Sequence, residues 1–331
     1  MKAGKQPGAT NRLKSAELSR ASVRLSDRSP SVASRWAAGR LEPGTSLKGC
    51  RPARRRVWRN RVNSALVVFA VVVALTPVVL ILYHITRKGL VSMSWEFLTS
   101  SMPLSFRKAG GGFLNALVGT AIMVGLAAVI SVPLGIMGAV YLVEYGKGNW
   151  LAKLIRFFSD VMSGVPSVFV GLFIYTALVV HFGFGALMGA ASLALIMIPI
   201  VVRSTEEMLK LVPSHLKDAS YALGAAKWQT ILRVVLPAAA PGITTGVMLA
   251  IARAAGETAP LILTALGSYQ LTAKLWGEPI SALTLAIFDG ARNPFAAGQA
   301  RAWAGALELL AIVLICTAVA RLIAARSRLN R

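Results

Sequence analysis

The chain has 331 residues, of which 55% are hydrophobic and 15% are charged, and its formal net charge at pH 7 is +23. A soluble globular protein of this length carries more charge on its surface. Here the apolar residues gather in long runs, which excludes an ordinary soluble domain. Runs of about 18 or more apolar residues predict membrane-spanning helices, because a helix satisfies its own backbone groups inside lipid. We therefore expect an all-α integral membrane protein with about six transmembrane helices.

A basic tail opens the chain over residues 1–56, and it is rich in Ser, Arg, Gly and Pro. Residues 1–61 hold 16 of the 36 Lys and Arg residues. Such a tail lacks a sustained apolar period, so we predict that it is disordered. Basic segments can bind nucleic acid. Beside a membrane span, however, clustered Lys and Arg indicate the cytoplasmic side. We therefore expect a cytoplasmic N-terminus, a transmembrane domain over 57–331, and no nucleic-acid partner.

The first half of that domain is predicted to hold three spans, at 62–85, 113–143 and 157–181. An external loop, 86–112, joins the first two. A short cytoplasmic turn from Glu144 to Arg156 joins the second and third, because it carries Lys and Arg. Gly164 and Pro166 fall inside the third span, near its inner half.

The second half is predicted to add three more spans, at 188–203, 238–266 and 302–323. Residues 204–236 form the longest polar stretch between spans, and their lysines and arginine predict a cytoplasmic loop. Residues 267–300 are expected outside, with a short re-entrant or interfacial helix over 283–288. Six spans place both termini in the cytoplasm.

The cytoplasmic loop 204–236 has the pattern of a small helix-turn-helix. Pro213 ends the preceding helix and Ser214 is expected to cap the next one. Gly224 ends or bends that segment. A second helical stretch then leads to Pro237 at the membrane. Such a projection suits a groove on a partner protein.

The spacing in this loop resembles the EAA loop of ABC importer permeases, which reads Glu-Ala-Ala, three residues, Gly, nine residues, Ile, one residue, Leu-Pro. This chain has Asp218-Ala219-Ser220 where the motif has Glu-Ala-Ala, and Val234 where the motif has Ile. The number of residues from this triplet to Gly224 and to Leu236-Pro237 is the same as in the motif. An ordinary amphipathic loop is the alternative. The resemblance implies coupling to an ATPase through Asp218, Ala219, Ser220, Gly224, Leu236 and Pro237.

Three charged residues near the membrane are candidates for a substrate path. Arg253 and Glu257 are four residues apart inside the fifth predicted span, so on a continuous helix they share one face. A charge at mid-membrane costs about 3 kcal/mol or more, and usually faces a pathway or a partner. The pair therefore either contacts a translocating anion or forms a structural ion pair. Arg203 is either a snorkelling arginine with salt bridges to Glu206 and Glu207, or a second basic group on the path.

Four sequence strings resemble the PstA family of phosphate-importer permeases. They are Ile251 to Leu261, Gly112 to Thr120, Arg203 to Glu207, and Ala302 to Gly305. The resemblance covers roughly residues 60–325. It implies the type I ABC importer (MetI-like) permease fold, a location in the bacterial inner membrane, and a role for Arg253 in phosphate transport.

The same resemblance implies a set of partners. They are a second permease (PstC-like), an ATPase dimer (PstB-like), an extracytoplasmic phosphate-binding protein (PstS-like), inorganic phosphate and membrane lipid. We expect no metal, no cofactor and no ATP hydrolysis by this chain, because the sequence lacks a phosphate-binding loop with its lysine. Three alternatives stay open: a secondary anion transporter that uses Arg253 and Glu257, a permease for sulfate or molybdate, and a membrane-anchored regulator with a nucleic-acid- or lipid-binding tail.

Overall fold

The computed structural model describes residues 54–146 and 148–329. The predicted disordered tail, 1–56, therefore lies almost wholly outside the described residues. The chain divides into two units, Met1–Ala74 and Leu75–Arg331. Within the described ranges every regular element is helical, apart from one isolated β-bridge between Leu266 and Ile280. Among these residues five helices are long and apolar enough to cross a membrane, or six if one bent pair counts as a span. The predicted all-α membrane architecture is confirmed.

The first predicted span is part of α3, which runs from Arg54 to Ser92. Its apolar, membrane-length part is Trp58–Ser92. The helix therefore extends beyond the predicted 62–85 at both ends, because the flanking arginines and lysines are good helix formers. The boundary between the two units falls within α3, and its C-terminal part belongs to the larger unit.

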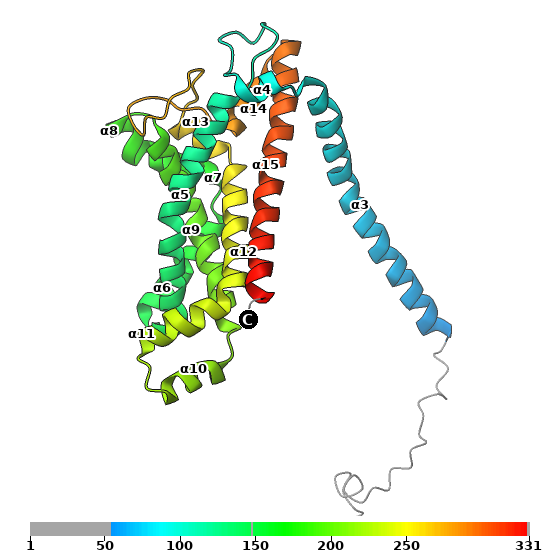
Figure 1. Cartoon of the computed structure of the whole chain (residues 1–331). Helices are drawn as coiled ribbons and strands as arrows, with labels where there is room; N and C mark the ends of the chain where they lie inside the picture. The colour runs from blue at the N-terminus through cyan, green and yellow to red at the C-terminus, as the bar shows by residue number, and fades with distance from the viewer. Residues whose placement is uncertain (1–53, 147, 330–331) are drawn as a thin grey trace, which may run out of the picture. The chain divides into compact units, whose positions relative to one another are not determined.

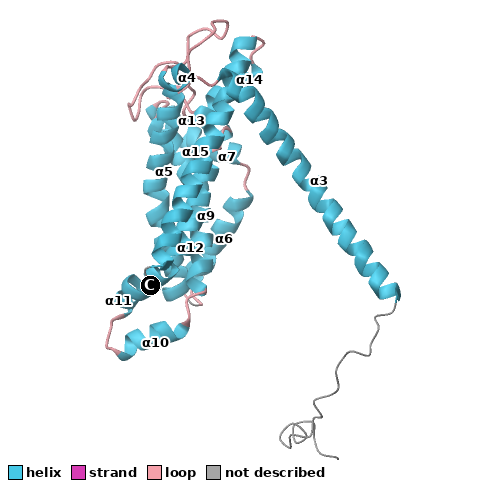
Figure 2. Ribbon diagram, turned by 45° about the vertical axis from the view of Figure 1, so that its right-hand side comes forward, coloured by secondary structure: helices cyan, strands magenta, loops and turns pink. Residues whose placement is uncertain are grey.

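Three long helices form the centre of the larger unit: α5 (Leu114–Val140), α9 (Ala186–Lys210) and α12 (Leu236–Ala255). A π-helical turn, Tyr141–Tyr145, continues α5. Figures 1 and 2 show these helices side by side. Small residues allow the close approach that helices need in a membrane. At Gly135 of α5, for example, an added Cβ would lie 2.6 Å from the side chain of Val201 on α9.

The last long helix is α15 (Ala296–Leu329), which packs on α12 and on the short helix α14 (Leu283–Arg292). Helix α14 contains the predicted short helix 283–288 and extends it. A second apolar cluster lies here, where Phe97 of α4 (Trp95–Thr99) packs against Phe113 and Leu283. Arg301 of α15 is buried and donates to the carbonyl oxygens of Lys108 at 2.5 Å and Gly110 at 3.1 Å. This arginine therefore fixes the 101–112 loop.

The third predicted span, 157–181, is wrong as a single straight helix. It is a pair: α6 (Trp150–Gly164), then α7 (Ser167–Ile174) with its continuation to Phe182, bent by 107°. Val165 takes an extended conformation, because the ring of Pro166 disfavours a helical residue before it. The prediction of a turn from Glu144 to Arg156 is also corrected, since its last seven residues already belong to α6.

The helices on both sides of the predicted loop 204–236 extend further into it than the sequence indicated. Helix α9 continues to Lys210, so its last polar turns are helical and not part of a loop. After α10 (Ser214–Ala222), a continuous helical run extends from Lys227 to Ala255, through α11 (Lys227–Thr230), a π-helical turn and α12. The predicted span 238–266 is wrong at its C-terminal end, because α12 stops at Ala255 and a separate helix, α13 (Ala259–Thr264), follows.

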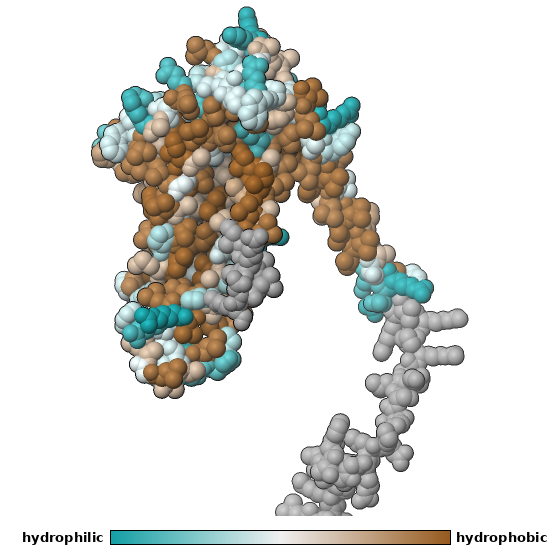
Figure 3. All heavy atoms as spheres, viewed as in Figure 1, coloured by the Kyte–Doolittle hydropathy of each residue, from teal (hydrophilic) through white to brown (hydrophobic). Residues whose placement is uncertain are grey.

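The larger unit has two polar ends. Helices α10 and α11 lie at one end, together with the last described turns of α15, and α4, α13 and α14 lie at the other. Figure 3 shows apolar side chains over the middle of the helices and hydrophilic ones nearer both ends. We call residues 211–235 the knob and the α4–α13–α14 region the opposite end. Apolar middles and polar ends are the pattern of a protein that spans a membrane.

Candidate functional site

Arg253 lies in the last turn of α12, where the helix ends. Gly256 is the C-cap, and its N–H donates to the carbonyl oxygen of Arg253 at 3.1 Å. Pro260 lies in the first turn of α13, where its missing N–H costs no helical hydrogen bond. The string from Gly256 to Pro260 therefore breaks the helix, and Glu257 lies in the break.

The predicted pairing of Arg253 and Glu257 is present, but in a different setting. Arg253 Nε and Glu257 Oε1 are 3.6 Å apart, although the two residues do not share one continuous helix. The arginine side chain is 59% exposed and the glutamate side chain 16%. The carbonyl oxygen of Glu257 accepts a hydrogen bond from the Thr284 hydroxyl at 3.0 Å, which ties the break to α14. The pair is thus held at a helix end with the guanidinium outward.

Arg253 belongs to an exposed stripe on α12. Thr245, Leu249 and Arg253 recur every four residues and are exposed, whereas Ala250 and Ala254 face the core. This face of α12 is not covered by the unit itself. Arginine there presents a planar fork of donors that matches oxyanion oxygens, and its exposure leaves those donors accessible.

Arg203 belongs to a separate ionic network at the end of α9 nearer the knob. It pairs with Asp160 of α6 and with Glu206 Oε2 at 3.5 Å. Glu206 is only 1% exposed and also accepts from Arg156 Nε at 2.9 Å and Lys210 Nζ at 2.7 Å. The predicted salt bridge from Arg203 to Glu206 is therefore confirmed, while Glu207 is exposed.

The structure does not bring Arg203 and Arg253 together at one point. Helices α9 and α12 run antiparallel, as the course of the chain in Figure 1 shows. Arg203 is two turns from the end of α9 that leads to the knob, whereas Arg253 is at the far end of a 20-residue helix that begins at the knob. A helix of that length extends for about 30 Å.

The knob is a closed helix-turn-helix. The hydroxyl groups of Ser220 and Thr230 are 2.9 Å apart and both are buried, so α10 is joined to α11. Gly224 turns the chain with φ +79°, a conformation that favours glycine, which confirms the predicted bend. The predicted capping role of Ser214 is wrong, because Pro213 occupies the cap position and no side chain caps α10.

The predicted coupling residues divide into outward and inward groups. Asp218, Ala219 and Gly224 are exposed on the knob, Ser220 is buried, and Leu236 with Pro237 is half-buried where α12 begins. Large apolar side chains accompany them on the surface, with Leu223 being 89% exposed. Exposed apolar side chains of this size around a polar turn are typical of an interaction surface.

A glutamate that the sequence analysis did not select, Glu144, anchors the knob to α5. Lys217 pairs with its carboxylate, and Lys227 Nζ donates to its carbonyl oxygen at 2.6 Å. Lys227 also lies over the ring of Tyr145, 4.2 Å from the centroid. Glu144 is 73 residues from Lys217 and 83 from Lys227, so no local spacing connects it to the knob. Two lysines from the two arms of the knob therefore converge on the end of one central helix.

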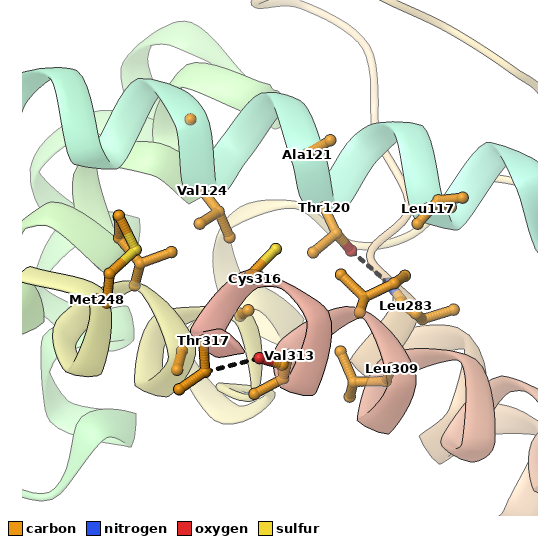
Figure 4. Close-up of a pocket in the computed structure, with 15 residues that line it drawn as sticks. Leu117, Thr120, Ala121, Val124, Met248, Leu283, Leu309, Val313, Cys316 and Thr317 are labelled. Atoms are coloured by element: carbon orange, nitrogen blue, oxygen red, sulfur yellow. Dashed lines mark hydrogen bonds between the residues drawn. The ribbon is translucent and has the colours of Figure 1, made fainter. Parts of the chain in front are cut away.

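An apolar cavity of about 300 Å³ lies between α5, α12 and α15 (Figure 4). Leu117, Met248 and Cys316 contribute to its lining, and the Thr120 hydroxyl is already bonded to the backbone N–H of Leu283 at 2.8 Å. These lining side chains offer an anion no charged partner, and burying a charge without a partner is costly. The cavity is therefore not an oxyanion site.

Residues 131–329 match the family model described as "Binding-protein-dependent transport system inner membrane component". The phosphate transport system permease protein PstA of Yersinia pestis is 42% identical over 281 residues, which cover 83% of this chain and 94% of that protein. PstA 1 of Mycobacterium tuberculosis is 40% identical over 285 residues, covering 83% and 92%. PstA of Haemophilus influenzae is 40% identical over 268 residues, covering 79% and 93%.

Two solved structures have a similar fold. An inward-facing structure of the MetNI methionine ABC transporter aligns with TM-score 0.50 and 18% identity, covering 66% of this chain and 94% of that one. A bacterial ABC transporter involved in import of the acidic polysaccharide alginate aligns with TM-score 0.50 and 17% identity, covering 82% and 99%. At this identity the likeness concerns the arrangement of helices alone.

Proposed function

The chain belongs to the family of binding-protein-dependent transport system inner membrane components, and from that premise we propose that it is the permease subunit of an ATP-driven importer of inorganic phosphate. The relatives named as phosphate permeases match this chain over more than nine-tenths of their length. ATP hydrolysis is assigned to a separate partner, as in binding-protein-dependent systems generally.

The observation that carries the proposal is the outward guanidinium of Arg253 at the break between α12 and α13. Its donors complement a tetrahedral oxyanion, and the neighbouring Gly256 in the helix break is exposed, so an ion can approach the backbone there. Glu257, 3.6 Å away, competes for the same donors. A competing carboxylate keeps binding weak enough for the anion to leave. Arg203 serves as a second basic group near the inner end of the path, although its present pairing with Asp160 occupies part of its charge.

We assign the partners by the surfaces they fit. A second permease (PstC-like) covers the exposed Arg253 stripe of α12, so that the path runs between two subunits. An ATPase dimer (PstB-like) binds the knob through Asp218, Ala219 and Gly224. A phosphate-binding protein (PstS-like) delivers phosphate at the opposite end, and membrane lipid surrounds the apolar helices.

Coupling follows from how the knob is built. The Ser220–Thr230 hydrogen bond makes it a single body, and Lys217 and Lys227 connect that body to α5 through Glu144. The helical run from Lys227 to Ala255 connects it to Arg253. A push on the knob by the ATPase is therefore transmitted to the substrate path as a rigid-body motion. In this arrangement Leu236 and Pro237 form the junction between knob and span.

The deciding experiment is reconstitution with the three partners in proteoliposomes. We expect ATP-dependent uptake of radiolabelled phosphate that excess unlabelled phosphate blocks and excess sulfate or molybdate does not. Equal competition by sulfate or molybdate would assign another oxyanion. Transport by this chain without the ATPase would favour the secondary transporter instead.

A further inference from the structure

A second cavity, of about 560 Å³, lies between the C-terminal part of α3 and the first turns of α15, within the unit Leu75–Arg331. It is near the opposite end, away from the knob. Its lining combines basic, aromatic, polar and small apolar residues, namely His84, Arg87, Lys88, Val91, Ser92, Ala296, Gln299, Ala300 and Trp303. Unlike the cavity in Figure 4, it is rich in hydrogen-bond donors.

The two helices that form this cavity are in tight contact. Gly89 of α3 is buried, and an added Cβ there would lie 2.8 Å from Leu307 Cβ and 2.9 Å from the carbonyl oxygen of Trp303. Lys88 lies over the Trp303 ring, with its Nζ 5.0 Å from the centroid. The glycine therefore sets the close approach, and the cation–π contact holds one wall of the cavity in place.

The cavity carries positive charge without a matching carboxylate. None of the nine lining residues is acidic, and within residues 54–146 and 148–329 neither Arg87 nor Lys88 forms an ion pair. The hydrogen bond from Arg87 to the Tyr83 hydroxyl is long, at 3.5 Å. The Gln299 amide donates one of its two hydrogens to the carbonyl oxygen of Asn293 at 3.0 Å and keeps the other for a ligand. Two uncompensated cations that share one hollow favour an anionic ligand.

The surroundings indicate that the ligand has an apolar part. Leu80, one turn before His84 on the same face of α3, is exposed, as are its apolar neighbours Val79 and Ile81. Basic and aromatic side chains at the end of an apolar helix are typical of the membrane interface. A free ion would leave this apolar surface unused, whereas acyl chains would cover it.

We propose that this cavity binds the phosphodiester headgroup of an anionic phospholipid. Arg87 and Lys88 contact the phosphate oxygens, Gln299 and Ser92 bond to the headgroup, and the acyl chains lie along α3. The lipid would brace α3 against α15 at the Gly89 contact. The site requires only that the chain spans a membrane, so it does not depend on which solute is transported.

The test uses the full chain assembled with its partners and stripped of bound lipid in detergent. Phosphatidylglycerol is titrated, bound lipid is counted by native mass spectrometry, and phosphatidylcholine serves as the neutral comparison. We expect the double variant Arg87→Gln/Lys88→Gln to bind phosphatidylglycerol about thirtyfold more weakly, because it removes the charge-assisted hydrogen bonds to the phosphate. The control, Lys153→Gln/Lys274→Gln, removes the same charge at two exposed positions that do not line the cavity and should bind as wild type does.

Unchanged phosphatidylglycerol affinity in Arg87→Gln/Lys88→Gln, or an equal loss in the control, would overturn the site. Displacement of the lipid by millimolar inorganic phosphate would reassign the cavity to the free ion. Should the double variant fail to assemble, the wild-type complex is photolabelled with phosphatidylglycerol that carries a diazirine in its headgroup. Labelling of peptides that contain residues 84–92 and 296–303 supports the proposal, and labelling confined to other peptides refutes it.

Discussion

Glu206 shows how one buried residue organises the charges at the end of α9. Its carboxylate accepts hydrogen bonds from Arg156 and Lys210 and lies 3.5 Å from Arg203 Nη1. Removing the carboxylate leaves three cations without their common partner, although each of them keeps access to water. Because of that access we expect Glu206→Gln to lower the free energy of unfolding by about 2–3 kcal/mol, less than the loss of a fully buried pair. Thermal unfolding in detergent measures it.

The matched control is Asp160→Asn, which removes the other acidic partner of Arg203. Asp160 is 54% exposed, so its ion pair is screened by solvent and should contribute less than about 1 kcal/mol. If Asp160→Asn lowers the free energy of unfolding as much as Glu206→Gln does, the burial of Glu206 does not account for its contribution to stability.

Arg253 is the residue at which the transport mechanism is most directly tested. Arg253→Gln removes the charge and the fork of donors, so we expect phosphate uptake to fall by about tenfold to a hundredfold, the worth of one charge-assisted hydrogen bond. The complex should still assemble, because the side chain packs little within this chain and is proposed to face the path between the subunits. Uptake of radiolabelled phosphate is compared with co-purification of the ATPase. Arg321→Gln, on the exposed surface of α15, is the control, and uptake at the wild-type rate in Arg253→Gln would exclude the contact.

The sequence predicted the Arg253–Glu257 pairing because the two residues are four apart, a spacing at which side chains can meet. It could not predict Arg156 and Asp160 as partners of α9, since they are 50 and 43 residues away from Glu206 and Arg203. Glu144 was missed for the same reason, being 73 residues from Lys217. Local spacing reports neighbours on one helix, whereas these contacts depend on how helices meet.

At the scale of elements, the turn of the knob offers a sharp comparison between two glycines. Gly224 has φ +79° and Gly148 has φ +84°, and an added Cβ at either would meet nothing within 4 Å. The same substitution therefore causes similar backbone strain at both, of about 1–2 kcal/mol. We expect Gly224→Asp to lose the ATPase, because it places a charge in the proposed docking surface, and Gly148→Asp to retain it.

Association is measured by co-purification, and coupled uptake in proteoliposomes is measured in parallel. Aspartate is chosen because it tolerates a left-handed conformation better than most residues. If both variants lose the ATPase, backbone strain and not the added charge is the cause. If both retain it and phosphate uptake is normal, the ATPase does not dock at Gly224.

The contact between Glu144 and Lys217 leads to a different prediction, in which a variant keeps the ATPase bound but loses the coupling of ATP hydrolysis to phosphate uptake. Glu144→Ala removes the carboxylate that pairs with Lys217 but leaves the exposed face of the knob unchanged. We expect the ATPase to remain bound and to hydrolyse ATP, while phosphate uptake per ATP falls several-fold. Lys217→Ala should behave likewise. Normal uptake per ATP in both variants would mean that force does not pass through this contact.

Prolines show why the elements were only partly predictable. Pro133 and Pro199 lie inside the continuous helices α5 and α9, whereas Pro166 ends α6 and produces the 107° bend. The residue type is the same in each case. Neighbouring helices can hold a proline-containing span together in a membrane, and Gly135 packs closely on Val201 just after Pro133. Which proline breaks its helix thus depends on tertiary contacts that the sequence pattern does not contain.

At the scale of the whole molecule, the bent α6–α7 pair decides the number of crossings. The contact of Glu144 with Lys217 places the end of the α5 run beside the knob. Helix α9 begins at the opposite end, where Leu187 N–H donates to the carbonyl oxygen of Leu275 at 2.8 Å. The pair between them therefore covers the distance from one end to the other, and counts as a span. With six spans, we expect the N-terminal tail and the knob to lie on the same side of the membrane.

Cysteine labelling tests this topology, because the chain has two native cysteines, Cys50 and Cys316. A Cys316→Ala background keeps Cys50 as a reporter of the tail. Asp218→Cys reports the knob and Arg292→Cys the opposite end, each with Cys50 replaced by serine. We expect a membrane-impermeant maleimide to label Cys50 and Asp218→Cys only in inside-out vesicles, and Arg292→Cys only in right-side-out vesicles. Labelling of the tail and the knob from opposite sides would mean that the α6–α7 pair re-enters without crossing, which would leave five spans.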